Sequence, residues 1–196
     1  MIDLIKRKTK NVDKKLKNAK QTRLLWLDLE MTGLSPEKDL ILEVAAIVTD
    51  WNFKELASYE GVIKNSSLKL KKRLANNAAF WNENPSSRDG LIEQNKIGKP
   101  LAEIEDEILK FIDKNFKANV PVILAGNSVH MDRRFIMNNW PRFDARLHYR
   151  MLDVSAWKVV FENKYRMKFV KPDMHRALDD IRGSIMELQY YLARIK

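Results

Sequence analysis

The sequence predicts an α/β fold in which a mixed β-sheet is flanked by helices. Near the start of the chain, three apolar segments follow one another with only short turns between them, a pattern that indicates antiparallel strands. Further along, short apolar runs alternate with segments of helical periodicity, as in sheets that are covered by helices. The 196 residues, of which 45 % are hydrophobic, fit one domain with a full core.

The first three predicted strands occupy residues 24–31, 41–49 and 55–63. Between the first two, Gly33 is free to adopt a positive φ angle and Pro36 cannot continue a strand ladder, so this segment is predicted to be a turn. A short turn rich in polar residues joins the second strand to the third. An antiparallel meander of three strands is therefore expected to open the domain.

Two helices are predicted next. Residues 68–81 have helical propensity and several basic side chains, and we expect this helix to end before Pro85, because proline disfavours a helical conformation in the residue before it. Apolar residues recur at helical spacing from Leu101 to Ile112, which predicts an amphipathic helix over residues 100–115.

The second half of the chain alternates strands and helices. Residues 120–125 predict a short strand, and a turn leads from it into a helix that runs to residue 139. A further strand over residues 148–154 is followed by a helix that we expect Ser155 to cap. Apolar residues at every third or fourth position predict a final helix over residues 176–195.

Charge divides the chain unevenly. Residues 1–23 contain nine Lys or Arg against two Asp, and so contribute +7 of the formal net charge of +10. We therefore expect a basic N-terminal arm, residues 1–21, and one domain, residues 22–196. The arm is expected either to attract nucleic acid or another anionic surface, or to be simply solvated.

Several classes of protein are excluded by composition. The chain has no cysteine, which rules out disulfides, thiolate zinc sites and a cysteine nucleophile. No apolar stretch is long enough to cross a membrane, and the arm lacks the apolar core of a secretory signal. We expect a cytoplasmic protein that does not associate with membranes.

Two acidic residues interrupt the first apolar strand. Side chains alternate between the faces of a strand, so Asp28 and Glu30 share a face and stand about 7 Å apart along it. Burying two like charges there is costly unless a cation compensates them, which points to a hard divalent metal ion. The alternative is that the strand ends near Leu27 and both acids are solvated.

Other candidate ligands occur later in the chain. Asp132 stands at the start of the helix that follows the strand over residues 120–125, and Asp179 and Asp180 lie in the last helix, beside small residues. His175 stands five residues before Asp180. Taken singly, each has an ordinary alternative: a surface acid favoured by a helix dipole, or a capping or surface histidine.

Together these residues resemble the three motifs of the DEDD exonucleases, histidine subclass. The motifs are Asp28-x-Glu30, then Asp132 after Gly126-Asn127-Ser128, then His175-x-x-x-x-Asp180. Their flanks resemble the oligoribonuclease family, in the segments WLDLEMTGL, GNSVHMDRRF, HYRMLDVS and HRALDDIRGSIMELQYY. The resemblance covers roughly residues 22–194. It implies an RNase H-like five-stranded sheet, a homodimer, and 3′→5′ removal of nucleotides from very short single-stranded RNA.

Phosphodiester hydrolysis explains why these residue types are needed. Two divalent cations neutralise the phosphate, activate water and stabilise the leaving oxygen, and Mg²⁺ or Mn²⁺ favours carboxylate ligands. The expected metal ligands are Asp28, Glu30, Asp132 and Asp180. Asp28 is expected to bridge the ions, with Glu30 and Asp180 on the ion that holds the nucleophile. His175 is the expected general base, since an imidazole accepts a proton near neutral pH.

Substrate-binding residues follow from the resemblance alone. It implies base contacts by Leu34 and Trp81 and a phosphate contact by Ser128. It also implies that Tyr149, as a catalytic residue, and Arg150, at the terminal phosphate, enter the active site from the partner subunit. For Trp81 the alternative is core packing, and for Tyr149 it is packing within its own subunit.

Two positions depart from the usual pattern of the family. Met131 stands where glutamine is usual and Ser86 where histidine is common, so the preferred length of the substrate stays open. We keep two alternative functions, which are another exonuclease of the same fold and a nucleic-acid-binding module without catalysis. Sensitivity to EDTA distinguishes an enzyme of this kind from simple binding.

Overall fold

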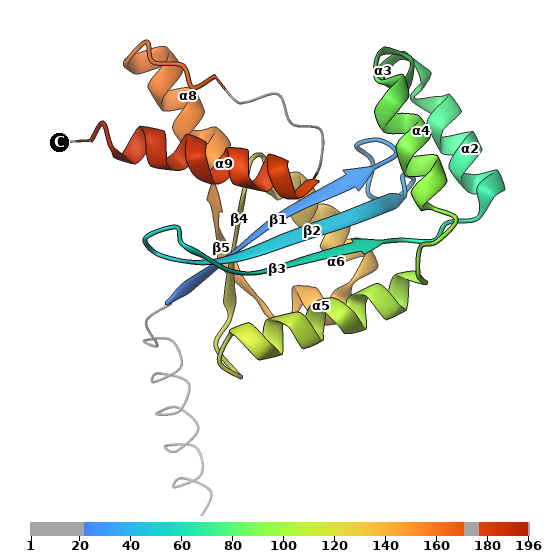
Figure 1. Cartoon of the computed structure of the whole chain (residues 1–196), viewed down its shortest axis with the longest axis horizontal. Coiled ribbons are helices and arrows are strands. Elements are labelled where there is room, and N and C mark those ends of the chain that lie inside the picture. Colours follow the sequence, from blue (N-terminus) through green and yellow to red (C-terminus); the bar gives the residue numbers. More distant parts are fainter. Residues whose placement is uncertain (1–21, 171–176, 196) are drawn as a thin grey trace, which may run out of the picture.

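The computed structural model describes residues 22–170 and 177–195, and its centre is a five-stranded mixed sheet (Figure 1). The strand order is β3-β2-β1-β4-β5. The pairs β1–β2 and β2–β3 are antiparallel, whereas β1–β4 and β4–β5 are parallel. The predicted meander and mixed sheet are therefore confirmed. The strands are β1 (Arg23–Met31), β2 (Ile41–Asp50), β3 (Glu55–Val62), β4 (Val122–Gly126) and β5 (Leu147–Asp153).

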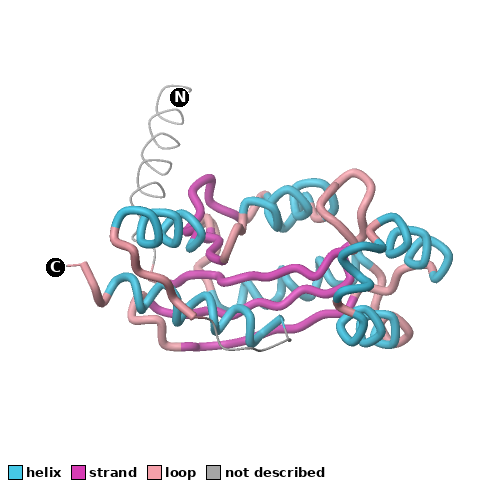
Figure 2. Tube along the Cα trace, turned by 90° about the horizontal axis from the view of Figure 1, so that it is seen from above, coloured by secondary structure: helices cyan, strands magenta, loops and turns pink. Residues whose placement is uncertain are grey.

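Helices cover both faces of the sheet, and three more lie beyond one end of its strands (Figures 1 and 2). One face packs against α5 (Leu101–Asn115), α6 (His130–Asn139) and α7 (Pro141–Asp144), and the other against α8 (Val154–Lys164) and α9 (Ala177–Leu192). The group at the end consists of α2 (Ser67–Asn76), α3 (Ala78–Glu83) and α4 (Pro85–Gln94). None of the described helices is long and apolar enough to cross a membrane.

The alternation of β1 decides which face its acidic residues occupy. Leu25, Leu27 and Leu29 pack in the core that includes α5 and α6. Leu24 and Trp26 pack in the core formed with α8 and α9. Because residues two apart share a face, Asp28 and Glu30 lie on the side of the sheet that α9 covers.

Two details of the helix prediction are wrong, and one helix was not predicted. The helix expected over residues 68–81 is broken at Asn77, whose side-chain amide donates to the Thr32 carbonyl at 2.8 Å and ties this point to the end of β1. The helical segment ends at Glu83, before Pro85, as predicted, but α4, which begins at Pro85, was not predicted; proline suits the first turn of a helix. Asp153 caps α8 in place of Ser155, because its carboxylate accepts the Ser155 N–H.

Two predictions lie outside the described residues. They are the basic arm, residues 1–21, and the candidate general base His175.

Candidate active site

The acidic residues of β1 stand where β1 outruns its parallel neighbour. The β1–β4 ladder has its last pair at Trp26 and Ala125, so Asp28 and Glu30 lie beyond it. A Cβ at Gly126 would stand 2.8 Å from the Leu27 carbonyl oxygen, so only glycine allows β4 to end this close to β1. The space beyond the end of β4 is taken by the first turn of α6.

Asp132 occupies that first turn and bonds directly to β1. Its side chain is 5 % exposed, and its Oδ1 accepts the N–H of Leu29 at 3.0 Å. This bond satisfies a backbone N–H that lies between the two acidic residues of β1. Burial raises the pKa of Asp132 to about 7, against the lowering effect of the Leu29 bond, and repulsion from Glu30 and Asp153 adds to the rise.

Glu30 is the most strongly perturbed of the acidic residues in the site. Its pKa is raised to about 8, mainly by burial and also by the charges of Asp28, Glu43 and Asp180. Glu43 stands directly opposite Glu30 in the β1–β2 register. Several carboxylates from β1, β2 and α9 therefore repel one another at one end of the sheet.

The two adjacent aspartates of α9 have different surroundings. Asp180 lines a cavity together with Glu30. Asp179 instead accepts a hydrogen bond from Arg182 at 3.1 Å, and Arg182 also pairs with Glu55 of β3. Asp180 is therefore the one of the pair that faces the other carboxylates, whereas Asp179 takes part in a link between α9 and β3.

The donor set fits a hard divalent cation. It consists of carboxylate oxygens, and the pKa values of Glu30 and Asp132 are raised mainly by burial and further by the neighbouring carboxylates. Among the described residues, no three Asp, Glu or His side chains come close enough to enclose an ion by themselves. Mg²⁺ usually keeps several waters and is bound through one or two carboxylates together with substrate phosphates. An ion here would complete its shell in the same way.

A cavity of about 500 Å³ opens beside these acids, between the sheet, α9 and the helices α3 and α4. Trp81 and Ser86 lie in its wall. Trp81 is 2 % exposed and its Nε1 donates to the Thr32 carbonyl at 3.0 Å, so it packs in the core as well as lining the cavity. Leu34, in the loop after β1, is 69 % exposed.

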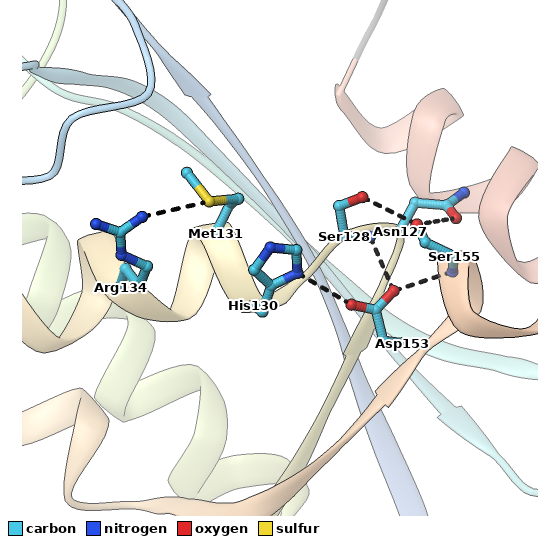
Figure 3. Close-up of polar contacts among 7 residues, drawn as sticks. All are labelled: Asn127, Ser128, His130, Met131, Arg134, Asp153 and Ser155. Carbon is cyan, nitrogen blue, oxygen red and sulfur yellow. Dashed lines mark hydrogen bonds and ion pairs between the residues drawn. The ribbon is translucent and has the colours of Figure 1, made fainter. Parts of the chain in front are cut away.

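Ser128 belongs to a hydrogen-bond network at the ends of β4 and β5 (Figure 3). Its N–H donates to Asp153 Oδ1 at 3.0 Å and to Ser155 Oγ at 2.8 Å, and the two serine hydroxyls are 2.9 Å apart. Asp153 Oδ2 also lies 3.3 Å from His130 Nδ1. Ser128 has a φ of 50°, an unusual backbone conformation that these bonds help to hold.

Sequence reasoning missed Glu43 and Asp153 as members of the site. An acid within the apolar segment over residues 41–49 is the signal for Glu43, and strand pairing then sets it opposite Glu30. Asp153 ends a strand two residues before a serine, which is a helix-start signal. In the structure its carboxylate also contributes to the raised pKa of Asp132.

The predicted partner-facing residues lie on the edge strand β5. Tyr149 is 74 % exposed, its ring stacks on His148, and the Arg150 guanidinium stands 5.0 Å from its centroid. Tyr149 is thus not packed inside its own sheet.

The sheet order and the carboxylates at the end of β1 define a protein of the exonuclease class, and residues 25–188 match the Exonuclease family. Within that class the chain belongs to the oligoribonuclease family. It is 41 % identical over 178 residues to an oligoribonuclease of Corynebacterium glutamicum (strain R), a match that covers 88 % of this chain and 80 % of that protein.

Solved structures show the same fold at low sequence identity. The exonuclease I of Methylocaldum szegediense superposes with a TM-score of 0.63, and the zinc-bound E. coli ExoI complex with single-stranded DNA with 0.58. Both are 15 % identical to this chain, and each match covers 89 % of it. The chain spans 41 % of each of these longer proteins, so the likeness concerns the fold alone.

Proposed function

We propose that this protein is a 3′→5′ exoribonuclease that degrades short single-stranded RNA, down to dinucleotides, to mononucleotides. The observation that carries the proposal is the convergence of carboxylates from β1, α6 and α9 beside a cavity, in a chain of the oligoribonuclease family. Such a site suits hydrolysis of a phosphodiester bond, because a phosphate reaches carboxylates only when cations stand between them.

Four residues would hold two divalent cations, which we propose to be Mg²⁺ or Mn²⁺. They are Asp28, Glu30, Asp132 and Asp180. When bound, the cations neutralise phosphate charge and lower the pKa of an attacking water. The bond from Leu29 to Asp132 keeps one oxygen of that carboxylate oriented toward the strand.

Other residues of this chain would move the proton and hold the substrate. We assign His175 as the acceptor of the proton from the attacking water. Leu34 and Trp81 would contact the bases, and Ser128 and Arg150 would contact a phosphate. Ser128 stands two residues before α6, and the bond from its N–H to Asp153 fixes its backbone, so its hydroxyl would make the phosphate contact.

We propose a homodimer in which Tyr149 reaches the active site of the other subunit. Strand β5 lies at the edge of the sheet, where its backbone is open to pairing. Exposed apolar side chains continue from this strand onto α8, namely Met151, Val159 and Val160. These residues supply the apolar surface that an interface of this kind needs.

We also propose that residues 1–21 form an arm that is accessory to catalysis, and that residues 22–196 form the exonuclease domain. The match to the Exonuclease family, over residues 25–188, supports this division because it begins just after the arm.

The decisive experiment measures turnover of 5′-phosphorylated RNAs of two to seven nucleotides. We expect mononucleotides to appear with Mg²⁺ or Mn²⁺, to disappear with EDTA, and to return when the cation is restored. Parallel DNA substrates measure the preference for ribose, and a 3′ block tests the direction. Retention of intact RNA with bound protein under all cation conditions would instead show a binding module. Efficient cleavage only of longer RNA or of DNA would show another exonuclease of the same fold.

A further inference from the structure

Phe80 is an exposed aromatic residue in the wall of the cavity. It belongs to α3, and 58 % of it is accessible to solvent. Most large apolar side chains near this point are buried, among them Leu70, Leu74 and Trp81. An exposed ring at the mouth of a cavity that also contains Glu30 therefore requires a separate explanation.

The ring of Phe80 has a fixed support. It packs edge-on against Trp81, with the ring centroids 5.0 Å apart and the planes at 83°. Trp81 is itself immobilised, because it is 2 % exposed and its Nε1 donates to the Thr32 carbonyl. Thr32 stands two residues after Glu30 in the same segment of chain. The path from Glu30 through Thr32 and Trp81 therefore holds Phe80 at a set position relative to the carboxylates.

The rest of the cavity leaves room for a flat group. Gly90 lines the wall that α4 contributes, and a Cβ built there would meet no atom within 4 Å. The volume of about 500 Å³ falls in the range of roughly 300–1,000 Å³ that is usual for small-molecule pockets. Side-chain amides and hydroxyls are available to the edges of a planar ligand, from Asn84, Ser86, Ser87 and Gln94.

We infer that Phe80 stacks on a nucleobase of the RNA held at this active site, an inference that rests on the proposed function. A base is the part of the substrate with a flat apolar face, and stacking on an aromatic ring accepts every base because each has a π-face. Phe80 carries no group that reacts with phosphate or water. It is a substrate-binding residue, and its contact is the same in the ground state and in the transition state.

Uniform binding of that kind changes KM and leaves kcat in place. Replacing Phe80 by alanine is expected to raise KM for a short RNA by roughly 5- to 160-fold, the effect of losing one base–aromatic stack. Phe80→Trp is expected to restore a KM near that of the wild type. The matched control is Trp51→Ala, which removes another exposed aromatic side chain, in the β2–β3 turn at the opposite end of β1 from Glu30.

Substrates that lack one base test the contact directly. On the dinucleotide that lacks the base stacked on Phe80, the wild type is expected to show a raised KM already. Phe80→Ala is expected to raise that KM little further. This non-additivity is expected for one of the two positions and not for the other. Size-exclusion chromatography of each variant checks whether Phe80 is instead covered by a second copy of the chain.

Three results would overturn the inference. They are an unchanged KM in Phe80→Ala, an equal rise on the normal dinucleotide and on both abasic dinucleotides, and a change of oligomeric state in Phe80→Ala. If the wild type hydrolyses RNA in any of these cases, the proposed function stands without the stacking contact. If the folded wild type hydrolyses no RNA, the proposed function fails, and the affinity of wild type and Phe80→Ala for a fluorescent dinucleotide in EDTA still decides whether Phe80 binds a base.

Discussion

Removing metal ions should make the stability of this protein fall as the pH rises, and Glu30 should account for much of the loss. In the folded protein the pKa of Glu30 is about 8, because of burial and repulsion from Asp28, Glu43 and Asp180. In the unfolded chain it returns to its ordinary value of 4.5. Between these two pH values the folded state keeps a proton that the unfolded state has lost, so stability decreases with increasing pH.

The size of this effect follows from the two pKa values. A full difference of about 3.5 pH units corresponds to roughly 5 kcal/mol, and the part that falls between pH 5.5 and pH 8 is about 3 kcal/mol. For a domain of this size that loss lowers Tm by roughly 6–12 °C. A divalent cation bound by the same carboxylates should remove most of the slope, because it binds their charged form.

The assay is thermal and urea unfolding of EDTA-treated protein at pH 5.5 and pH 8. Between pH 5.5 and pH 8, the free energy of unfolding of Glu30→Gln should fall by about 3 kcal/mol less than that of the wild type, since glutamine does not titrate. Glu93→Gln is the matched control, because its side chain is 71 % exposed in an ion pair with Lys96. The reasoning is refuted if metal-free wild type and Glu30→Gln lose the same stability between the two pH values.

Three further predictions concern the active site, the dimer and the arm. Asp180→Asn should lower kcat by at least about 100-fold, whereas Asp179→Asn should keep near-wild-type turnover; the reverse pattern in steady-state assays would exchange their roles. Mixing inactive Asp28→Ala with impaired Tyr149→Ala should restore part of the activity as subunits exchange, since one active site of the heterodimer then carries neither substitution. Activity no greater than the sum of the two variants measured separately would show that Tyr149 acts in the active site of its own subunit. Deleting residues 1–20 should leave dinucleotide turnover at physiological salt within about threefold of the full chain, because salt screens interactions between exposed charges beyond about 8 Å. Loss of turnover in a deletion variant that is still folded and dimeric would contradict an accessory role for the arm.

The sequence alone predicted most of the sheet and the face that Asp28 and Glu30 share. Alternation along residues 24–31 placed Asp28 and Glu30 on one face, and the structure shows that face under α9. Strand signals were reliable because each strand is a short apolar run between turn residues. The order and spacing of the motifs predicted the oligoribonuclease family, which the match to known proteins confirms.

Local signals were less informative where a side chain from elsewhere ends or begins a helix. Asn77 breaks the helix expected over residues 68–81 because its amide bonds to Thr32, 45 residues away in the sequence. Propensity describes each segment alone and contains no term for such a bond.

Only the tertiary structure decided how the acids differ from one another. Asp179 and Asp180 are chemically identical and adjacent, yet Arg182 engages the first while the second faces Glu30 across a cavity. The pKa of Glu30 likewise depends on Glu43, which strand pairing sets opposite it. Charge repulsion and burial depend on distances in space, and those distances arise only when β1, β2, α6 and α9 pack around one end of the sheet.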